Sequence, residues 1–383
     1  MRILVVGSGI AGQTLACALA KRGIACDVVE VKPAFDIAGA GLYVQGPALR
    51  AFQDIGVVEA IVAAGLPLAD DTSLVTDSAG MPMARPSYPR IAGPHIPSVV
   101  PIRRRALHEI LARAVEAAGV AVRMGVTVDA LAQAPDGVTA TFSDGRVDRY
   151  DLVVGADGIR SRVRALLFPA AQPQYTGYAN WRVILPTPAG LERTTWMMGT
   201  GTSFGIVPIA PGLVYIAGVS KEPGNPRFER AELPALCRSR FAEFGGFAPA
   251  LLAQVTAPDQ VVYTPIEEVR LAPPWHKGRV VLVGDAAHAG TPFWAMGATM
   301  AIEDAVLLAT LLARGTPIEA VLPDWMARRL PRCRFVQDGS LQTGRRSHEE
   351  SPEALAAREH YVRNLMVADV ARRYATLAEP FVW

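Results

Sequence analysis

The chain has 383 residues, half of them hydrophobic, and a formal net charge of +2. This length fits one large domain or two of ordinary size with a substantial core. The near-neutral charge gives no reason to expect nucleic acid or an anionic membrane as a partner, and no segment approaches the length of a membrane span. Four scattered cysteines without metal-ligand spacing, in a chain without an export signal, predict buried, reduced thiols in a cytoplasmic protein that binds no metal. The cysteines are Cys17, Cys26, Cys237 and Cys333.

The first informative pattern is an apolar run, Ile3 to Val6, that leads directly into glycines. Such a run predicts a buried parallel strand, and the segment 13–21, rich in Ala and Leu, predicts the helix after it. The glycines of Gly7-Ser8-Gly9-Ile10-Ala11-Gly12 permit a tight turn, close approach of a pyrophosphate and close helix packing. A second strand, 25–29, ends at Glu30, where a ribose hydroxyl partner is expected. The segment predicts an FAD or NAD site, because a carboxylate at Glu30 repels a 2′-phosphate.

The middle of the chain changes pattern twice. A proline-rich stretch, 73–97, breaks any helix and is expected to enter a second domain. A helix over 106–118 and a strand over 151–154 return to the first domain, with a hairpin at Asp144-Gly145. From about 172 to 265, short alternating segments predict a mostly antiparallel sheet. Its strands are expected at 177–185, 194–198, 203–208 and 214–219.

The last third begins with another apolar run, Val280 to Val283, that ends at a glycine and predicts a further buried strand. Asp285 would lie just past the carboxyl end of that strand, where open α/β sheets place ligands. A helix N-cap is the alternative for Asp285. Asp157, just past an earlier strand, is either a ligand contact or a turn residue. A helix over 301–313 follows, and Pro317 marks the start of a C-terminal helical region.

These elements predict an α/β fold with interleaved domains. We expect a Rossmann-like FAD-binding domain of the glutathione-reductase type, a mostly antiparallel β-sheet substrate domain, and C-terminal helices. The expected ranges are 1–72, 98–171 and 266–315 for the FAD-binding domain, 73–97 and 172–265 for the sheet domain, and 316–383 for the helices. A solvated face or a subunit contact is expected for the arginines Arg328, Arg329, Arg332 and Arg334.

The three glycine-containing segments together resemble those of the class A flavoprotein monooxygenases, the group typified by para-hydroxybenzoate hydroxylase and salicylate hydroxylase. The likeness covers about the first four-fifths of the chain. Besides the first glycine motif it rests on Gly155-Ala156-Asp157-Gly158, on Gly284-Asp285-Ala286-Ala287-His288, and on the segment from Pro292 to Thr299. The resemblance implies that Arg104 reaches the flavin. It also implies that Gly39-Ala40-Gly41 forms the loop in which the flavin ring moves.

The resemblance implies an FAD-dependent monooxygenase that consumes NADH or NADPH and dioxygen. Such an enzyme hydroxylates an aromatic or N-heteroaromatic small molecule through a flavin C4a-hydroperoxide, and we expect a monomer or homodimer. Met296 and Thr299 stand where the family often has an amide and an asparagine, so ring contacts are expected from the backbone of Gly297 and Ala298. The expected cofactor-binding residues are Gly7, Ser8, Gly9, Ile10, Ala11, Gly12, Glu30, Val31, Lys32, Gly41, Arg104, Val126, Asp157, Asp285, Pro292, Gly297, Ala298 and Thr299.

The sheet domain is expected to cover the flavin ring, and its aromatic side chains are candidates for substrate contact. Because alternate residues of a strand face opposite sides, some of them must point into the core instead. Arg182 could hold a carboxylate with its planar fork, but a surface salt bridge is the simpler expectation. No catalytic side chain is singled out, because the cofactor carries the chemistry. The expected pocket residues are Tyr43, Gln45, Arg182, Trp196, Tyr215, Phe293 and Trp294.

Two alternatives remain open. A flavin-dependent halogenase shares the fold, and the segment Trp181 to Pro186 partly matches that group's Trp-x-Trp-x-Ile-Pro pattern. A flavin-binding protein with little turnover, which traps an unstable intermediate, is the second alternative, and the altered position at Met296 leaves it open. The sequence distinguishes neither NADH from NADPH nor one substrate from another.

Overall fold

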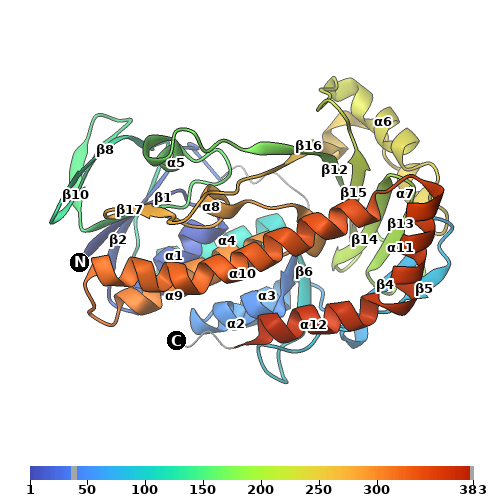
Figure 1. Cartoon of the computed structure of the whole chain (residues 1–383), viewed down its shortest axis with the longest axis horizontal. Coiled ribbons are helices and arrows are strands. Elements are labelled where there is room, and N and C mark those ends of the chain that lie inside the picture. Colours follow the sequence, from blue (N-terminus) through green and yellow to red (C-terminus); the bar gives the residue numbers. More distant parts are fainter. Residues whose placement is uncertain (36–40, 380–383) are drawn as a thin grey trace.

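The computed structural model describes residues 1–35 and 41–379 of the chain. Two large sheets occupy opposite ends of the molecule, and a long helix, α10 (Ile318–Ser347), runs between those ends (Figure 1). Among the described residues, no helix combines the length and the apolarity that crossing a membrane requires.

The first domain is built on a six-stranded sheet with the order β17-β18-β11-β1-β2-β7. The run from Ile3 to Val6 is almost fully buried, as expected for a strand covered on both faces. Five strands pair in parallel and β17 is the antiparallel edge strand. The strands are β1 (Arg2–Val6), β2 (Ala25–Glu30), β7 (Val122–Met124), β11 (Leu152–Gly155), β17 (His276–Lys277) and β18 (Val280–Leu282).

The carboxyl ends of β1, β11 and β18 lie at the same edge of this sheet, because the three strands are parallel neighbours. The three glycine-containing segments follow these three strands directly. Parallel pairing therefore gathers segments that begin at positions 7, 155 and 284, far apart along the chain. Ligands of open α/β sheets bind at this edge.

Helices and two smaller sheets complete the first domain. The predicted hairpin is confirmed, with Gly145 at φ 81 between two antiparallel strands. The helices are α1 (Ile10–Lys21), α2 (Gly46–Asp54), α3 (Val58–Ala64), α4 (Arg104–Ala117), α5 (Arg162–Leu167), α8 (Asp285–His288) and α9 (Gly297–Leu312). The smaller sheets contain β8 (Val128–Ala134), β9 (Gly137–Phe142) and β10 (Val147–Tyr150), and β3 (Gly41–Gln45) with β6 (Val99–Arg103).

The second domain is a seven-stranded sheet with the order β16-β12-β15-β14-β13-β4-β5. It is mostly antiparallel, but β4 pairs in parallel with β13, which brings the proline-rich excursion into this sheet. β16 runs through the expected boundary between 265 and 266, so that boundary falls inside a strand. The strands are β4 (Leu74–Asp77), β5 (Pro82–Ala84), β12 (Gln174–Pro186), β13 (Thr195–Met198), β14 (Thr202–Ala210), β15 (Leu213–Lys221) and β16 (Val262–Glu268).

One face of the seven-stranded sheet buries its own aromatic core. Trp181 and Phe204 are fully buried there and pack against Phe241. The short helices α6 (Leu233–Arg240) and α7 (Ala248–Leu252) contribute to this core. The opposite face is therefore the one available for a ligand, as the period of two along a strand requires.

The C-terminal region consists of α10, α11 (Pro352–Asn364) and α12 (Met366–Ala378). α10 packs against α9 of the first domain, and α11 contacts β5 of the second. α12 then returns along the lower side of the molecule toward α2 (Figure 1). The C-terminal helices thus brace both domains.

The expectation that the arginines of α10 face solvent or a second subunit is wrong for two of them. The Arg329 side chain is fully buried, and its guanidinium binds Asp304 and Glu303 of α9. Arg332 also binds Glu303, at 2.8 Å. In sequence, a run of arginines resembles the solvated face of a helix. In the structure, buried carboxylates on α9 form ion pairs with two of these arginines.

The cysteines are free, as expected. Cys17, Cys237 and Cys333 are buried, whereas Cys26 is only half-buried on β2. Burial raises the pKa of Cys237 to about 12, so this thiol stays protonated and unreactive at neutral pH.

Candidate active site

A cavity of about 570 Å³ lies between the two domains. Gly9, Gly158 and Asp285 line it, so each of the three glycine-containing segments contributes to its wall. The cavity extends from the start of α1, past the start of α9, to the C-terminal helices. Its size is in the range of small-molecule and cofactor sites.

The first glycine motif leaves open space at the start of α1. Gly9 is the N-cap of α1, and a methyl group on it would meet no atom within 4 Å. Gly12 is the opposite case, because a methyl group there would overlap the carbonyl oxygen of Gly7. The free N–H groups and the positive end of the dipole at the start of α1 favour an anion beside Gly9.

Glu30 lies at the end of β2, next to this motif. Its carboxylate accepts from the backbone N–H of Ser8 at 2.8 Å and from that of Lys32 at 3.0 Å. Val126 donates its N–H to the Glu30 carbonyl, so both segments meet at this edge of the sheet. Glu30, Val31, Lys32 and Val126 lie together beside the cavity but do not line it. Their contact with the adenosine half of a cofactor stays a prediction.

The other end of the cofactor region is formed by Asp285, by the 3-10 turn η4 (Pro292–Trp294) and by the first turn of α9. Asp285 begins α8, three residues beyond the end of β18, and it is exposed. Gly297, Ala298 and Thr299 line the cavity at the start of α9, where N–H groups have no intrahelical acceptor. Met296 packs into the core instead, so the backbone offers the polar contacts here.

Asp157 is not placed as a cofactor contact. One of its carboxylate oxygens accepts from the Ser161 hydroxyl at 2.5 Å and the other from the Val163 N–H at 3.0 Å. These bonds fix the start of α5, and Asp157 does not line the cavity. Its neighbours Ala156 and Gly158 do line it. The second segment therefore contributes backbone to the cavity. The contacts of Asp157 fit the turn alternative, and its contact with the cofactor stays a prediction.

Arg104 and Gly41 line the cavity where the family resemblance expects flavin contacts. Arg104 begins α4, and Gly41 begins β3 with its α-carbon close to the Tyr215 ring. Gly39 and Ala40, the rest of the expected mobile-flavin loop, lie outside the described residues.

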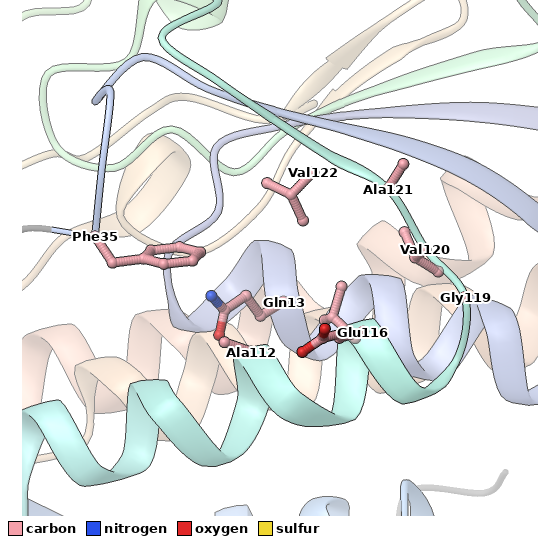
Figure 2. Close-up of a pocket in the computed structure, with 9 residues that line it drawn as sticks. Gln13, Phe35, Ala112, Glu116, Gly119, Val120, Ala121 and Val122 are labelled. Carbon is pink, nitrogen blue, oxygen red and sulfur yellow. The ribbon is translucent and has the colours of Figure 1, made fainter.

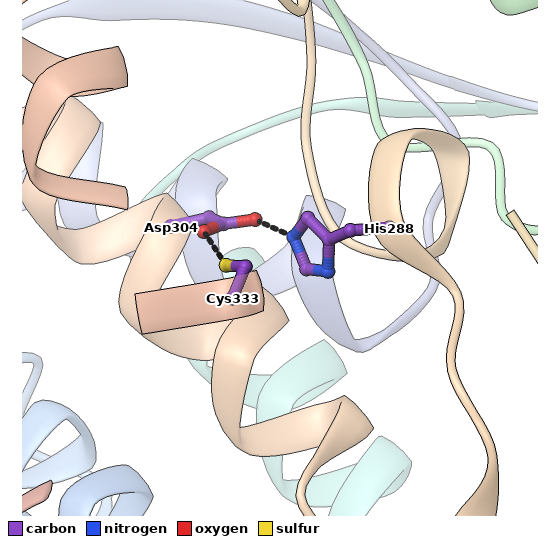
Figure 3. A group of neighbouring side chains, drawn as sticks. All are labelled: His288, Asp304 and Cys333. Carbon is purple, nitrogen blue, oxygen red and sulfur yellow. Dashed lines mark hydrogen bonds and ion pairs between the residues drawn. The ribbon is translucent and has the colours of Figure 1, made fainter. Parts of the chain in front are cut away.

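A buried ionic network holds the third segment in place (Figure 3). One oxygen of Asp304 on α9 accepts from the Gly284 N–H at 2.8 Å and from Nε2 of His288 at 2.6 Å. Its other oxygen accepts from Nε of Arg329 at 2.6 Å. Burial opposes charge on His288, but its contacts with Cys333 and Asp304 raise its pKa well above the ordinary value. This network fixes the backbone from which Asp285 projects.

The same cluster has the composition of a metal site. Ligand atoms of His288, Asp304 and Cys333 lie within 4.8 Å of one another. However, the Arg329 guanidinium binds Asp304 and lies 3.4 Å from the Cys333 sulfur. A fixed positive charge there repels a second cation, so we assign no metal to this cluster.

All seven residues expected in the substrate pocket line the cavity. Tyr43 packs edge-on against Tyr88 and Trp196, with ring centres 6.3 and 6.0 Å apart. Trp294 donates from Nε1 to the Thr343 hydroxyl at 2.8 Å, and Phe293 packs against Tyr178. These rings form an aromatic wall beside the first turn of α9.

Arg182 does not form the surface salt bridge that seemed simplest from the sequence. Its guanidinium donates to Thr264 at 2.7 Å, and its Nε is buried without a hydrogen-bond partner. Burial lowers the pKa of Arg182, and the charge of Arg104 lowers it further. The side chain therefore points into the cavity region from β12.

Sequence reasoning missed the contribution of the C-terminal helices. Residues of α10, α11 and α12 line the far end of the cavity, although nothing in their sequence links them to the glycine motifs. The cavity-lining residues from these helices are Thr343, Arg346, Ser347, Arg358, Tyr361, Val362, Met366, Val370, Arg373 and Tyr374.

A smaller cavity of about 340 Å³ lies between α1 and α4, where Phe35 covers it (Figure 2). Gln13 and Glu116 are its polar lining residues. Gln13 contacts Nδ1 of His108 at 3.2 Å and donates to Ser8 at 3.3 Å. Its lining includes none of the expected cofactor residues, so the larger cavity is the candidate active site.

Comparison with known proteins agrees with this geometry. Residues 1–339 match the model of a family described as FAD binding domain. The chain belongs to this family of FAD-dependent aromatic monooxygenases. It is 33% identical over 369 residues to aurachin C monooxygenase/isomerase of Stigmatella aurantiaca, with 95% of this chain and 94% of that protein covered. It is 32% identical over 380 residues to 2-heptyl-3-hydroxy-4(1H)-quinolone synthase of Pseudomonas aeruginosa, with 97% and 96% covered.

Among solved structures, Klebsiella pneumoniae HpxO complexed with FAD and uric acid superimposes with a TM-score of 0.88 and 26% identity. The alignment covers 98% of this chain and 96% of that one. The expected fold class, the family and FAD as the cofactor are therefore confirmed.

Proposed function

We propose that this monooxygenase uses NADH or NADPH to hydroxylate a flat aromatic or N-heteroaromatic molecule in the cavity between its two domains. The observation that carries the proposal is the meeting of all three glycine-containing segments and the aromatic wall in one cavity. The relatives named for aurachin C and for a 4(1H)-quinolone, and the structure that contains uric acid, support a fused N-heteroaromatic ring.

Bound FAD would supply two-electron reduction by NAD(P)H and activation of dioxygen at its C4a position. The start of α1 at Gly9 would bind the pyrophosphate, and Asp285 would accept from ribityl hydroxyls. The first turn of α9, Gly297 to Thr299, would direct N–H groups at the ring. Its dipole would favour negative charge there, as reduction of the ring requires.

The aromatic wall would hold the substrate flat and exclude water from the reacting face. Tyr43, Trp196, Phe293 and Trp294 supply this wall from both domains. The sequence contains no second dinucleotide-binding motif, which supports transient binding of NAD(P)H at the same cavity.

Neither alternative gains support from the structure. Trp181, the residue on which the partial halogenase match depends, is fully buried in the core of the sheet domain and does not line the cavity. Met296, whose identity suggested a protein of low turnover, packs into the core of the first domain. The altered position therefore leaves the ring side of the cavity intact.

The test is substrate-stimulated NAD(P)H oxidation by the FAD-loaded protein, with dioxygen uptake and product mass recorded for phenols, pyridines, quinolones and purines. A compound that accelerates NAD(P)H oxidation and gains one oxygen atom supports the proposal. Asp285→Ala should lose FAD affinity, whereas Asp324→Ala, on the exposed side of α10, should not. Tightly bound FAD without NAD(P)H oxidation by any compound favours the low-turnover alternative.

A further inference from the structure

The cavity carries more positive charge than the cofactor motifs explain. Two carboxylates line it, Glu267 and Asp285, and Glu267 is already paired with Arg160 at 2.6 Å. Five arginines line the same cavity. They are Arg104, Arg182, Arg346, Arg358 and Arg373. A cavity with this excess of cations concentrates anionic ligands.

Arg373 of α12 reaches this cavity beside the aromatic wall. Its guanidinium carbon lies 4.0 Å from the centre of the Trp294 ring. Its Nε is buried and has no hydrogen-bond partner, and within residues 1–35 and 41–379 the side chain forms no ion pair. A desolvated guanidinium without an anion is unfavourable, and a bound anion would offset that cost.

Arg346 of α10 lines the same cavity as Arg373. Its guanidinium carbon is 3.4 Å from the centre of the Tyr361 ring, and no carboxylate of the described chain pairs with it. Burial lowers the pKa of Arg373, and the charge of Arg346 lowers it further. Both guanidinium groups line one cavity, and each lies over an aromatic ring.

The other cavity arginines contact protein atoms or the expected flavin position, although Nε of Arg182, like that of Arg373, is buried without a hydrogen-bond partner. Arg358 donates to the carbonyl oxygens of Gly199 and Ser347. Arg104 stands at the flavin position that the family resemblance gives. Arg182 donates to Thr264 and neighbours Arg104. Apart from Arg104 at the expected flavin position, Arg346 and Arg373 are therefore the two cavity arginines whose charge has neither an ion pair nor a hydrogen bond within the described residues.

We propose that Arg346 and Arg373 bind a carboxylate carried by the aromatic substrate. The inference rests on the proposed hydroxylase function and narrows its substrate class to aromatic or N-heteroaromatic acids. Two guanidinium forks suit the geometry of a carboxylate. Arg373 lies over Trp294, which belongs to the aromatic wall, so an acid held by this pair would place its ring beside that wall.

The test is equilibrium binding to the FAD-loaded protein, followed by the change in flavin absorbance or fluorescence. The probes are salicylate, 6-hydroxynicotinate and 4-hydroxyquinoline-2-carboxylate, each compared with its neutral carboxamide. The variants are Arg346→Gln and Arg373→Gln. Arg372→Gln is the matched control, because Arg372 lies on the same helix with a side chain that is 72% exposed and pairs with Asp369.

We expect at least one acid to bind the unaltered protein about 10- to 100-fold more tightly than its carboxamide, as lost charge-assisted hydrogen bonds predict. Arg346→Gln and Arg373→Gln should each remove most of that preference and leave carboxamide binding unchanged. Arg372→Gln should bind like the unaltered protein. Comparison of acid with carboxamide on the unaltered protein keeps the test valid if a variant does not fold.

Equal or tighter binding of every carboxamide, or no binding of any acid, would overturn the inference. Loss of the acid preference in Arg182→Gln but not in Arg373→Gln would place the carboxylate at β12 and overturn it too. If Arg346→Gln and Arg373→Gln bound NADPH more weakly than the unaltered protein but bound the acids equally well, the two arginines would be assigned to the 2′-phosphate of NADPH instead. Hydroxylation of a neutral quinolone would then leave the proposed function standing without this inference.

Discussion

Gln45 donates its side-chain amide to the carbonyl oxygen of Trp294 at 2.7 Å, which ties β3 to the turn before α9. The same amide donates to the Ala295 carbonyl at 2.9 Å, and the Gln45 side-chain oxygen accepts from the Tyr374 hydroxyl. Gln45 was expected to contact substrate, and it does line the cavity. Its polar atoms are nevertheless occupied, so it positions the segment that precedes α9.

Replacement of Gln45 should therefore loosen the aromatic wall. Gln45→Leu leaves two carbonyl groups and the Tyr374 hydroxyl without partners, which should lower the free energy of unfolding by about 1–3 kcal/mol. FAD content should stay high, while more NAD(P)H is consumed per product formed. Tyr374→Phe removes one of the three hydrogen bonds and should have a smaller effect on both. If Gln45→Leu left both the free energy of unfolding and the amount of NAD(P)H consumed per product unchanged, this role would be contradicted.

The glycines of the first motif should separate cofactor binding from folding. Gly9→Ala adds a methyl group where no protein atom lies within 4 Å, so the protein should fold normally yet lose FAD affinity. Gly12→Ala drives the methyl group into the Gly7 carbonyl, so the fold itself should weaken. Thermal unfolding of the apoprotein and FAD titration distinguish the two effects. Tight FAD binding by Gly9→Ala would show that no pyrophosphate lies beside this residue.

Arg329 should contribute far more to stability than its neighbours in sequence. Arg329→Met leaves the buried carboxylates of Asp304 and Glu303 without one of their cations, which should lower the free energy of unfolding by about 3–5 kcal/mol. Arg328→Met is the matched control, because Arg328 lies next to Arg329 on the same helix but has a side chain that is 31% exposed and pairs with Asp324, which is 44% exposed. Chemical denaturation measures both variants. A loss below 1 kcal/mol in Arg329→Met would mean that its ionic network does not hold the third segment.

His348 should lower the free energy of unfolding as the pH falls from neutral to acidic values. It is fully buried between α10 and the sheet domain, with Nδ1 2.9 Å from the Gly344 carbonyl and Nε2 3.2 Å from the Ser203 hydroxyl. Burial lowers its pKa from 6.5 to about 4. The folded state binds a proton on His348 less readily than the unfolded state does. The contribution of neutral His348 to the free energy of unfolding is therefore complete above pH 6.5 and is lost as the pH falls toward 4.

Between pH 7 and pH 4 the unaltered protein should lose on the order of 3 kcal/mol more of its free energy of unfolding than His348→Gln does, because glutamine does not titrate. Denaturant unfolding of the two proteins at a series of pH values measures this difference. Parallel pH profiles for the two proteins would show that His348 titrates normally in the folded state.

The meeting of the three glycine-containing segments in one cavity could be predicted from sequence because it depends on local patterns. A buried strand, a glycine turn and a helix lie within the first 21 residues, and parallel pairing then brings the later segments to the same edge. Asp157 could not be decided from sequence, because a carboxylate after a strand can bind a ligand or fix the start of the next helix, and its contacts with Ser161 and Val163 show the second arrangement.

The C-terminal half of the site could not be predicted in this way. Arg373 contacts Trp294 only because α12 folds back across the molecule, and no periodicity in the chain encodes that return. Likewise, the buried position of Arg329 depends on Asp304 and Glu303 of a different helix. Long-range ion pairs of this kind carry no local signal, so a run of arginines resembles a solvated face until its partners are known.

The most direct test of the central claim is incubation of the FAD-loaded protein with NAD(P)H, a panel of aromatic acids and neutral N-heteroaromatic compounds, and dioxygen labelled with oxygen-18. Mass spectrometry of the products then shows the source of any added oxygen. The account predicts a product that carries one labelled oxygen atom. A product labelled from water, or NAD(P)H oxidation without any oxygenated product, would contradict the assignment of the cavity as a hydroxylation site.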